Sequence, residues 1–149
     1  MERAVYYGNM PALDRYHRAV ASALRKDGWT ITDDPLTLEL EERTFYVDFG
    51  VERLLAAEKG AERIAVEVKT FGSPSPIADL EQARGQFSLY EEVLRETQPD
   101  RMLYLAIPEA AFHGVFHERI GQIILQNRIR RAFCFSPERE EIMQWIPAV

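Results

Sequence analysis

The stretch Met102–Ile107 is an unbroken run of apolar residues, and it constrains the fold more than any other part of the chain. A short continuous apolar run is typical of a strand that is buried on both faces at the centre of a sheet. The segments around it follow a mixed order: a helix, several antiparallel strands, a long helix, this buried strand, a helix and two strands. That order predicts an α/β or α+β fold with one central sheet.

The other segments follow from periodicity and from turn and capping residues. Apolar residues recur with helical spacing from Leu13 to the stop signal Gly28, and a long helix is expected from the N-cap Ser75 and the first helical residue Pro76 to Gln98. The remaining predicted segments are the strands Trp29–Thr32, Leu36–Leu40 and Thr44–Gly50, a hairpin of Leu54–Ala57 with Arg63–Lys69, the helical stretch Val115–Asn127, and the strands Arg130–Phe135 and Glu141–Ile146. Residues 1–9 lack periodicity and are expected to be a flexible extension before one domain over residues 10–149.

Length and composition exclude several classes of protein. A chain of 149 residues suits one domain, and its 46% hydrophobic content is too high for a disordered protein. The one cysteine, Cys134, allows no intramolecular disulfide and no cysteine-based zinc site. No apolar run approaches the ~20 residues of a membrane span, and the N-terminus lacks the apolar region of a secretion signal. We therefore expect a cytoplasmic protein that does not bind membranes.

The charge of the chain bears on whether nucleic acid is a partner. A net charge of −6 has the wrong sign for non-specific binding to phosphate backbones, unless a local basic patch or bound metal ions reverse the field. Arg128, Arg130 and Arg131 form the one dense basic cluster of the sequence. Two interpretations of this cluster stay open: contact with DNA phosphates, or interaction with the negative end of the preceding helix.

The segment Ile64–Lys69 carries the main candidate chemistry. On a strand, its β-branched residues point into the core, whereas Glu67 and Lys69 share the opposite face. Asp48 lies on the predicted strand Thr44–Gly50, on the face away from that strand's apolar residues. If the two strands pair, Asp48 and Glu67 can share Mg²⁺ or Mn²⁺, and Lys69 can stabilise charge in a phosphoryl transition state. The alternative is an ordinary ion pair on a half-exposed strand.

A polar ridge on the predicted long helix is a second candidate element. Gln82, Gln86 and Tyr90 follow one another at i+4 spacing beside the apolar stripe that begins at Ile77, and Asp79 precedes them near the helix start. Long amides and a phenol at the edge of a helix can bind phosphate, a base or metal-bound water. A solvated polar face is the competing interpretation.

Taken together, these elements resemble a known nuclease superfamily. Asp48, then Glu67-Val68-Lys69, then a helix with Gln86-Phe87-Ser88-Leu89-Tyr90 is similar to the restriction-endonuclease-like PD-(D/E)XK arrangement, although Val47 stands where that pattern has Pro. Residues 10–147 more specifically resemble the cyanobacterial XisH family, the fdxN-element excision controlling factors. The matching stretches lie within residues 10–17, 24–32, 56–60, 64–69, 78–83 and 144–147.

The resemblance implies a fold and a set of residue roles. The fold would be a single restriction-endonuclease-like α/β domain with a central mixed sheet flanked by helices. Asp48 and Glu67 would be ligands of Mg²⁺ or Mn²⁺, with the carbonyl of Val68 as a third ligand. Lys69 would be the catalytic cation and Gln86 an auxiliary group.

The family name further implies a factor needed to excise a DNA element during heterocyst development, together with a recombinase and the companion protein XisI. It does not imply that the factor itself cuts DNA. Three functions therefore stay open: a Mg²⁺-dependent endonuclease, a non-catalytic accessory protein that acts by protein or DNA contact, and a toxin-like partner held by its companion. The negative net charge favours the accessory protein, and a homo-oligomer is compatible with each function.

Three further polar residues have two interpretations each. His17 shares a helix face with apolar residues, so it is either a packed core residue or, with Asp14 one turn earlier, a group that reaches the metal site. Glu58 is either a surface charge at the end of the predicted hairpin or an added acid near the site.

Overall fold

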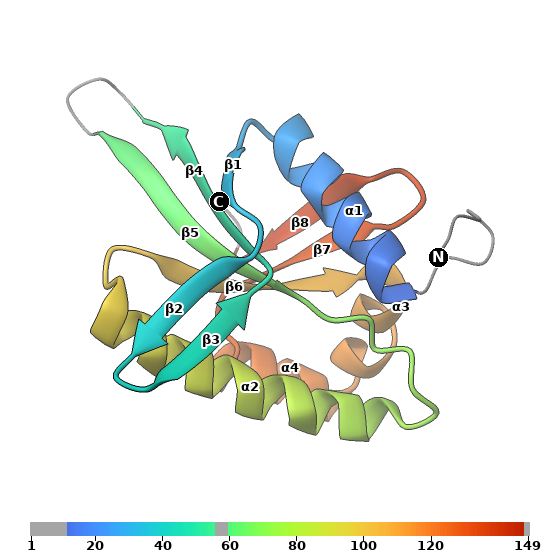
Figure 1. Ribbon diagram of the computed structural model, residues 1–149. Coiled ribbons are helices and arrows are strands. Elements are labelled where there is room, and N and C mark those ends of the chain that lie inside the picture. The colour runs from blue at the N-terminus through green and yellow to red at the C-terminus, as the bar shows by residue number, and fades with distance from the viewer. Residues whose placement is uncertain (1–11, 56–59, 148–149) are drawn as a thin grey trace, which may run out of the picture.

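The computed structural model describes residues 12–55 and 60–147, which form an α/β fold on a six-stranded mixed sheet (Figure 1). A two-stranded hairpin, β2 with β3, extends beside this sheet. The described elements are α1 Ala12–Lys26, β1 Thr30–Asp33, β2 Leu36–Leu40, β3 Arg43–Val47, β4 Phe49–Leu54, β5 Ala61–Val68, α2 Pro76–Thr97, β6 Met102–Pro108, α3 Glu109–Phe112, the 3₁₀-helix η3 Val115–His117, α4 Arg119–Asn127, β7 Ala132–Ser136 and β8 Glu141–Ile146.

The strand order of the large sheet is β1-β4-β5-β6-β7-β8. Strands β5, β6 and β7 are parallel to one another, and the other neighbours are antiparallel. The apolar run Met102–Ile107 forms β6, between β5 and β7. Leu105 of this strand belongs to one core cluster and Ala106 to the other, so both faces of β6 are covered. The prediction of a buried central strand is confirmed.

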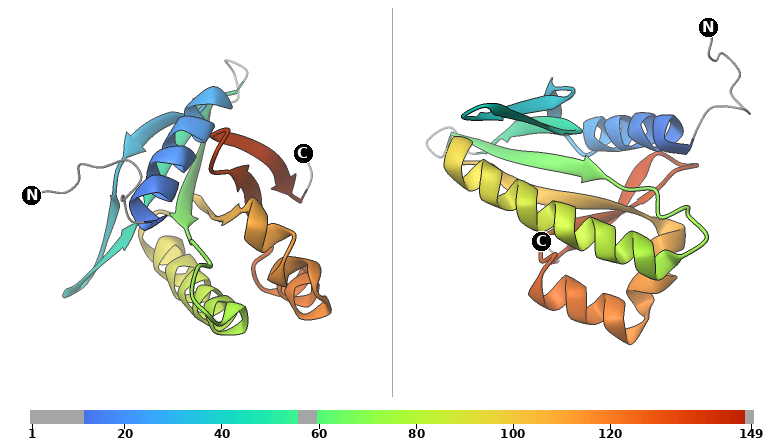
Figure 2. Two further views of the ribbon diagram at one scale, coloured as in Figure 1. Left: turned by 90° about the vertical axis from the view of Figure 1, so that its right-hand side faces the viewer. Right: turned by 60° about the horizontal axis from the view of Figure 1, so that its bottom comes forward.

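Helices cover both faces of the sheet, as the two views of Figure 2 show. Helix α1 packs Val20 and Leu24 against one face, and α2 and α4 pack Phe87 and Leu125 against the other. Within the described residues, no helix is long and apolar enough to cross a membrane.

Helix α2 begins where the sequence predicts. Ser75 caps it, because its hydroxyl accepts a hydrogen bond at 3.2 Å from a backbone N–H in the first turn, and Pro76 takes the first helical position. The helix ends at Thr97. Ile77 is 47% exposed, so the predicted apolar stripe is wrong at this residue and begins at Leu80 instead.

The prediction of one strand over Thr44–Gly50 is wrong, because the chain changes partners at Asp48. Strand β3 pairs with β2 in the hairpin, whereas β4 pairs with β1 and β5 in the large sheet. The carboxylate of Asp48 accepts a hydrogen bond from the backbone N–H of Val68 at 2.8 Å, which holds the chain at this break. As a result Val47 and Phe49 enter different core clusters, rather than sharing one face of a strand.

The chain between β6 and β7 also differs from the predicted single helix over Val115–Asn127. A short helix α3 and the 3₁₀-helix η3 precede α4, which begins only at Arg119. Gly121 packs directly on the backbone of Val115 and Phe116, where a Cβ atom would overlap that backbone. The following strand begins at Ala132 rather than at Arg130, because its pairing with β6 starts there.

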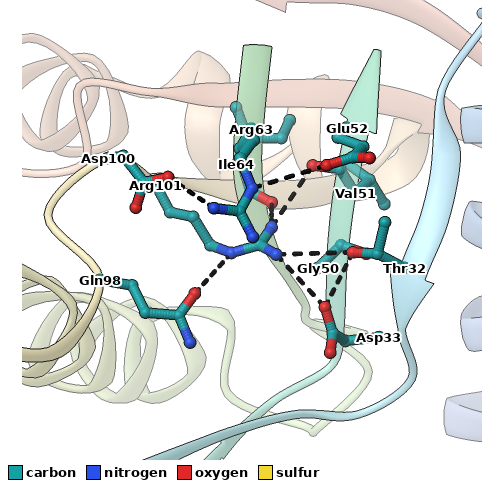
Figure 3. A network of polar contacts seen from close by, with 10 residues as sticks. All are labelled: Thr32, Asp33, Gly50, Val51, Glu52, Arg63, Ile64, Gln98, Asp100 and Arg101. Atoms are coloured by element: carbon teal, nitrogen blue, oxygen red, sulfur yellow. Dashed lines mark hydrogen bonds and ion pairs between the residues drawn. The ribbon is translucent and has the colours of Figure 1, made fainter. Parts of the chain in front are cut away.

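A buried arginine ties several segments together (Figure 3). Arg101 follows α2 and is 4% exposed. Its guanidinium donates hydrogen bonds to the carbonyl oxygens of Val51 and Ile64 and to the side chains of Thr32, Asp33 and Gln98. Gly50 makes room for this group, since a Cβ atom there would lie 2.8 Å from Asp33 Oδ2 and 3.1 Å from Arg101 Nη1. Burial lowers the pKa of Arg101, but a guanidinium remains charged at neutral pH.

Candidate metal centre

The pairing of β4 with β5 brings Asp48 and Glu67 together. Its register pairs Phe49 with Val66, and the continuation of that register sets Asp48 opposite Glu67. The Asp48 N–H donates to Glu67 Oε1 at 3.3 Å, and the N–H of Val68 donates to Asp48 Oδ2 at 2.8 Å. The sequence predicted that Asp48 and Glu67 would meet if the strands that carry them pair. The structure places both carboxyl groups in one cluster.

The second oxygen of each carboxylate faces a basic side chain. Asp48 Oδ1 lies 3.7 Å from His17 Nδ1, and Glu67 Oε2 lies 3.8 Å from Lys69 Nζ, both beyond hydrogen-bond distance. The side chain of Lys69 is 22% exposed and that of Glu67 is 11% exposed. The cluster therefore combines two carboxylates and an ammonium group, and Asp48 Oδ1 and Glu67 Oε2 receive no hydrogen bond from these two basic side chains.

Burial and repulsion between the carboxylates hold a proton on this cluster. Burial raises the pKa of Glu67 to about 8; the charge of Asp48 adds to the rise, and the charge of Lys69 opposes it. Two adjacent carboxylates ionise together only at a cost, because each disfavours the charge of the other. A bound divalent cation would replace the proton and remove that cost.

We expect the stability of the metal-free protein to fall as the pH rises from about 4.5 to about 8. The unfolded chain releases the Glu67 proton near the ordinary pKa of 4.5, whereas the folded state keeps it up to about pH 8. The folded state therefore binds more protons in this range, so the free energy of unfolding decreases with pH and this contribution is constant above it. Urea unfolding in EDTA at several pH values measures the slope. A slope that Glu67→Gln leaves unchanged would show that another group causes it.

Two members of the polar ridge on α2 belong to the surroundings of the carboxylates. Gln86 Nε2 donates to the hydroxyl oxygen of Tyr90 at 3.1 Å. Burial raises the pKa of Tyr90, and the charges of Glu67 and Asp48 raise it further, so its phenol lies within the field of both carboxylates. Gln86 Oε1 is buried, and no described residue donates a hydrogen bond to it. The ridge thus brings an acceptor without a partner close to the cluster.

Other residues singled out in the sequence lie apart from the carboxylates. Gln82 and Asp14 are exposed, and none of the contacts described for this part of the chain joins them to the cluster. Asp79 orders the loop before α2 instead, where its Oδ2 accepts a hydrogen bond from the Ser73 N–H at 3.2 Å. Glu58 lies outside the described residues.

His17 approaches the cluster from α1, and its other nitrogen is held by Asp34, which no sequence pattern marks as a site residue. His17 Nε2 lies 2.8 Å from Asp34 Oδ1, and the imidazole packs on Phe49 with 4.2 Å between ring centroids. The segment Asp33-Asp34-Pro35 indicated only a turn. Its contact with α1 depends on the tertiary fold and has no local signal in the sequence.

The arginine cluster lies at a different edge of the sheet. Lys69 follows the C-terminal end of β5, whereas Arg130 and Arg131 precede β7, which runs in the same direction as β5. Arg128 Nη1 donates to the carbonyl oxygen of Asn127 at 3.3 Å. The structure therefore does not bring these arginines to the carboxylates.

The donor set fits Mg²⁺ or Mn²⁺ better than zinc. Within the residues that the structure describes, no group of three or more His, Cys, Asp or Glu side chains is placed to hold a metal ion. Mg²⁺ is usually bound by one or two carboxylates, several waters and substrate phosphates, whereas a structural zinc site needs four protein ligands. The adjacent carboxylates of Asp48 and Glu67 therefore match a Mg²⁺ site rather than a structural zinc site.

Comparisons with known proteins agree on one family. The family model described as XisH protein matches residues 10–143. The crystal structure of an XisH family protein from Nostoc punctiforme PCC 73102 is similar over 89% of this chain and 99% of that chain, with a TM-score of 0.80 and 37% sequence identity. The crystal structure of an fdxN element excision controlling factor protein from Anabaena variabilis is similar over 89% of this chain and 98% of that chain, with a TM-score of 0.78 and 39% identity. Among proteins with curated descriptions, none matches.

Proposed function

Because the chain belongs to the XisH family, we propose that it acts on DNA as a factor that controls the excision of a DNA element. The relative from Anabaena variabilis is described as an fdxN element excision controlling factor, and 39% identity over nearly its whole length supports the same role here. The partners would be DNA, a companion protein like XisI and a recombinase. Self-association into a homo-oligomer is compatible with this role.

The chemistry that the cluster supports best is phosphodiester cleavage by a restriction-endonuclease-like domain of the PD-(D/E)XK type. The observation that carries this proposal is the meeting of Asp48 and Glu67, from the ends of two paired strands, beside Lys69. The mixed sheet with helices on both faces supports the same fold class.

The roles of the residues follow from their atoms. Asp48 and Glu67 would hold Mg²⁺ or Mn²⁺, with the Val68 carbonyl as a third ligand. Such a cation supplies a Lewis acid and lowers the pKa of a bound water. The ammonium of Lys69 would stabilise negative charge on the scissile phosphate, and Gln86 Oε1 would accept a hydrogen bond from an attacking water.

His17 would act as an auxiliary group next to Asp48. Asp34 fixes the imidazole through Nε2, which leaves Nδ1 directed at Asp48 Oδ1. In this position His17 can accept or donate a proton at the edge of the cluster.

We expect the wild type to nick or linearise plasmid DNA in Mn²⁺, and Lys69→Met to slow this cleavage about 10²-fold or more because a charge that stabilises the transition state is lost. Asp48→Asn should abolish the Mn²⁺-dependent cleavage, because a proposed ligand of the cation is lost. A gel assay of supercoiled plasmid over time measures the rate. Lys26→Met is the matched control, since Lys26 lies at the exposed C-terminal end of α1 and donates only to the Arg139 carbonyl among the described contacts.

The same assay separates the nuclease from an accessory protein. A wild type that binds DNA or its companion but never cleaves with Mg²⁺ or Mn²⁺ would contradict the nuclease proposal and favour a non-catalytic role. Equal cleavage rates for wild type and Lys69→Met would show that the charge of Lys69 does not contribute to cleavage.

A further inference from the structure

Two adjoining hollows of about 200 Å³ each share Glu91 and Arg130 and so form one groove. Helix α2 forms one wall of this groove, and the C-terminal end of α4 with the segment before β7 forms the other. We call it the arginine groove, which is lined by Arg84, Arg95, Arg128, Arg130 and Arg131.

The arginines of the groove come from parts of the chain that are far apart in the sequence. Arg84 and Arg95 lie three turns apart on α2, about 16 Å along the helix. The other three arginines line the opposite wall. Glu91 is the carboxylate in the lining, and Glu92 is paired with Arg95 at 2.7 Å. Positive charge therefore dominates here, in a chain whose net charge is −6.

Arg95 is paired with Glu92 and Arg128 donates to the Asn127 carbonyl, but contacts within the described part of the protein do not account for the charges of Arg84 and Arg130. Arg84 and Arg130 are exposed, and among the described residues no carboxylate lies within ion-pair distance of either guanidinium. At the end of α4, the backbone N–H groups of Arg128 and Ile129 donate to the Ile124 carbonyl and Arg128 Nη1 donates to the Asn127 carbonyl, but no described hydrogen bond joins the side chain of Arg130 to this helix. Capping of α4 therefore does not explain Arg130.

We propose that the arginine groove binds the phosphodiester backbone of DNA. Guanidinium groups make bidentate contacts with phosphate oxygens. Ser88 and Asn127 in the hollow beside Arg84 add neutral donors of the kind that contact DNA backbones. The hollow beside Arg84 is lined by polar and charged residues alone, whereas Leu94, Pro99, Met102 and Leu103 help to line the hollow beside Arg95. Because the cores of protein–protein interfaces are apolar and poor in charged residues, the lining beside Arg84 fits a phosphate backbone better than an acidic protein.

The groove and the carboxylate cluster lie on different faces of α2. Arg84 and Gln86 are two residues apart, which is about 200° around a helix, and Ser88 and Tyr90 repeat the same offset. DNA in the groove would thus be held without contact to Glu67. The inference rests on the proposed function only in taking DNA as the ligand, and it requires no cation.

Fluorescence anisotropy of a labelled ~20-base-pair duplex, measured in EDTA over a range of salt concentrations, tests this proposal. The variant Arg84→Gln/Arg128→Gln/Arg130→Gln should bind at least about tenfold more weakly, and its slope of log K against log salt should be smaller by about 2 to 3. The matched control Arg25→Gln/Arg43→Gln/Arg119→Gln removes the same charge from exposed positions elsewhere and should stay within about threefold of wild type.

Each outcome decides the proposal. A loss confined to the groove variant, with unchanged circular dichroism, supports it; if the triple variant unfolds, Arg130→Gln alone should lower the slope by about 1. Equal losses in both triple variants, no binding by the wild type, or equal binding of the duplex and polyglutamate would overturn it. Glu67→Gln should bind the duplex like wild type in EDTA, so failure of the groove and failure of the nuclease site are distinguishable.

Discussion

Replacing Glu67 by glutamine is expected to stabilise the metal-free protein by about 1–3 kcal/mol at pH 8.5 and to abolish its stabilisation by Mn²⁺. The gain follows from burial next to Asp48, which raises the pKa of Glu67 to about 8 and makes its ionised form unfavourable. Glutamine keeps an oxygen that can accept the Asp48 N–H and adds a donor in place of a charge. For a chain of this size the gain is a rise of roughly 2–10 °C in Tm.

Glu67→Gln should lose the stabilisation by Mn²⁺, because glutamine is a neutral and weaker ligand for a hard cation. Wild type in Mn²⁺ at about 100 times its Kd should gain about 2.7 kcal/mol of stability, and Glu67→Gln should gain none. Differential scanning calorimetry with and without Mn²⁺ measures both effects. Glu81→Gln, on the exposed surface of α2, is the control and should change neither. A variant that is less stable than wild type without metal would contradict the raised pKa.

The second large effect is expected at Arg101, where methionine should lower the free energy of unfolding by about 3–5 kcal/mol. Arg101 is buried, and methionine offers no donor for the groups it serves. The carbonyl oxygens of Val51 and Ile64 would lose its hydrogen bonds, and the carboxylate of Asp33 would lose its cation. Urea unfolding followed by circular dichroism measures the loss.

A neighbouring arginine supplies the control for this prediction. Arg63 pairs with Asp100 at 2.7 Å and with Glu52 at 3.6 Å (Figure 3). Its side chain, however, is 40% exposed. Exposed ion pairs contribute little, so Arg63→Met should cost about 1 kcal/mol or less. Similar losses for Arg63→Met and Arg101→Met would show that burial of the Arg101 network is not what stabilises this part of the sheet.

The parts of the fold with strong local signals could be predicted from the sequence. The apolar run of β6 and the Ser75-Pro76 start of α2 were such signals, and the structure has both where they were expected. The break at Asp48 could not be predicted, because alternation continues through it and a hydrogen bond from Val68, far along the chain, holds it. The network of Arg101 likewise depends on strands that meet only in the folded chain.

The candidate site likewise has residues that could be predicted from the sequence and residues that could not. Glu67 and Lys69 stood out because charged residues interrupt an otherwise apolar strand, and Asp48 could be added only on the condition that the strands pair. Asp34 carried no signal, since its contact with His17 joins a turn to a helix. The structure brings Asp48, Glu67 and Lys69 together, and their roles as ligands and catalytic cation remain predictions.

Asp48 and Glu67 are proposed to form a site for one divalent cation. Titration with Mn²⁺ at about pH 8.5, with free Mn²⁺ followed by electron paramagnetic resonance, tests it most directly, since ligand protons are released above the raised pKa. We expect one Mn²⁺ per chain for wild type and for Glu81→Gln, and binding weaker by about 100-fold or more for Asp48→Asn. If wild type binds no Mn²⁺, or if Asp48→Asn binds it with unchanged affinity, Asp48 and Glu67 do not form this cation site.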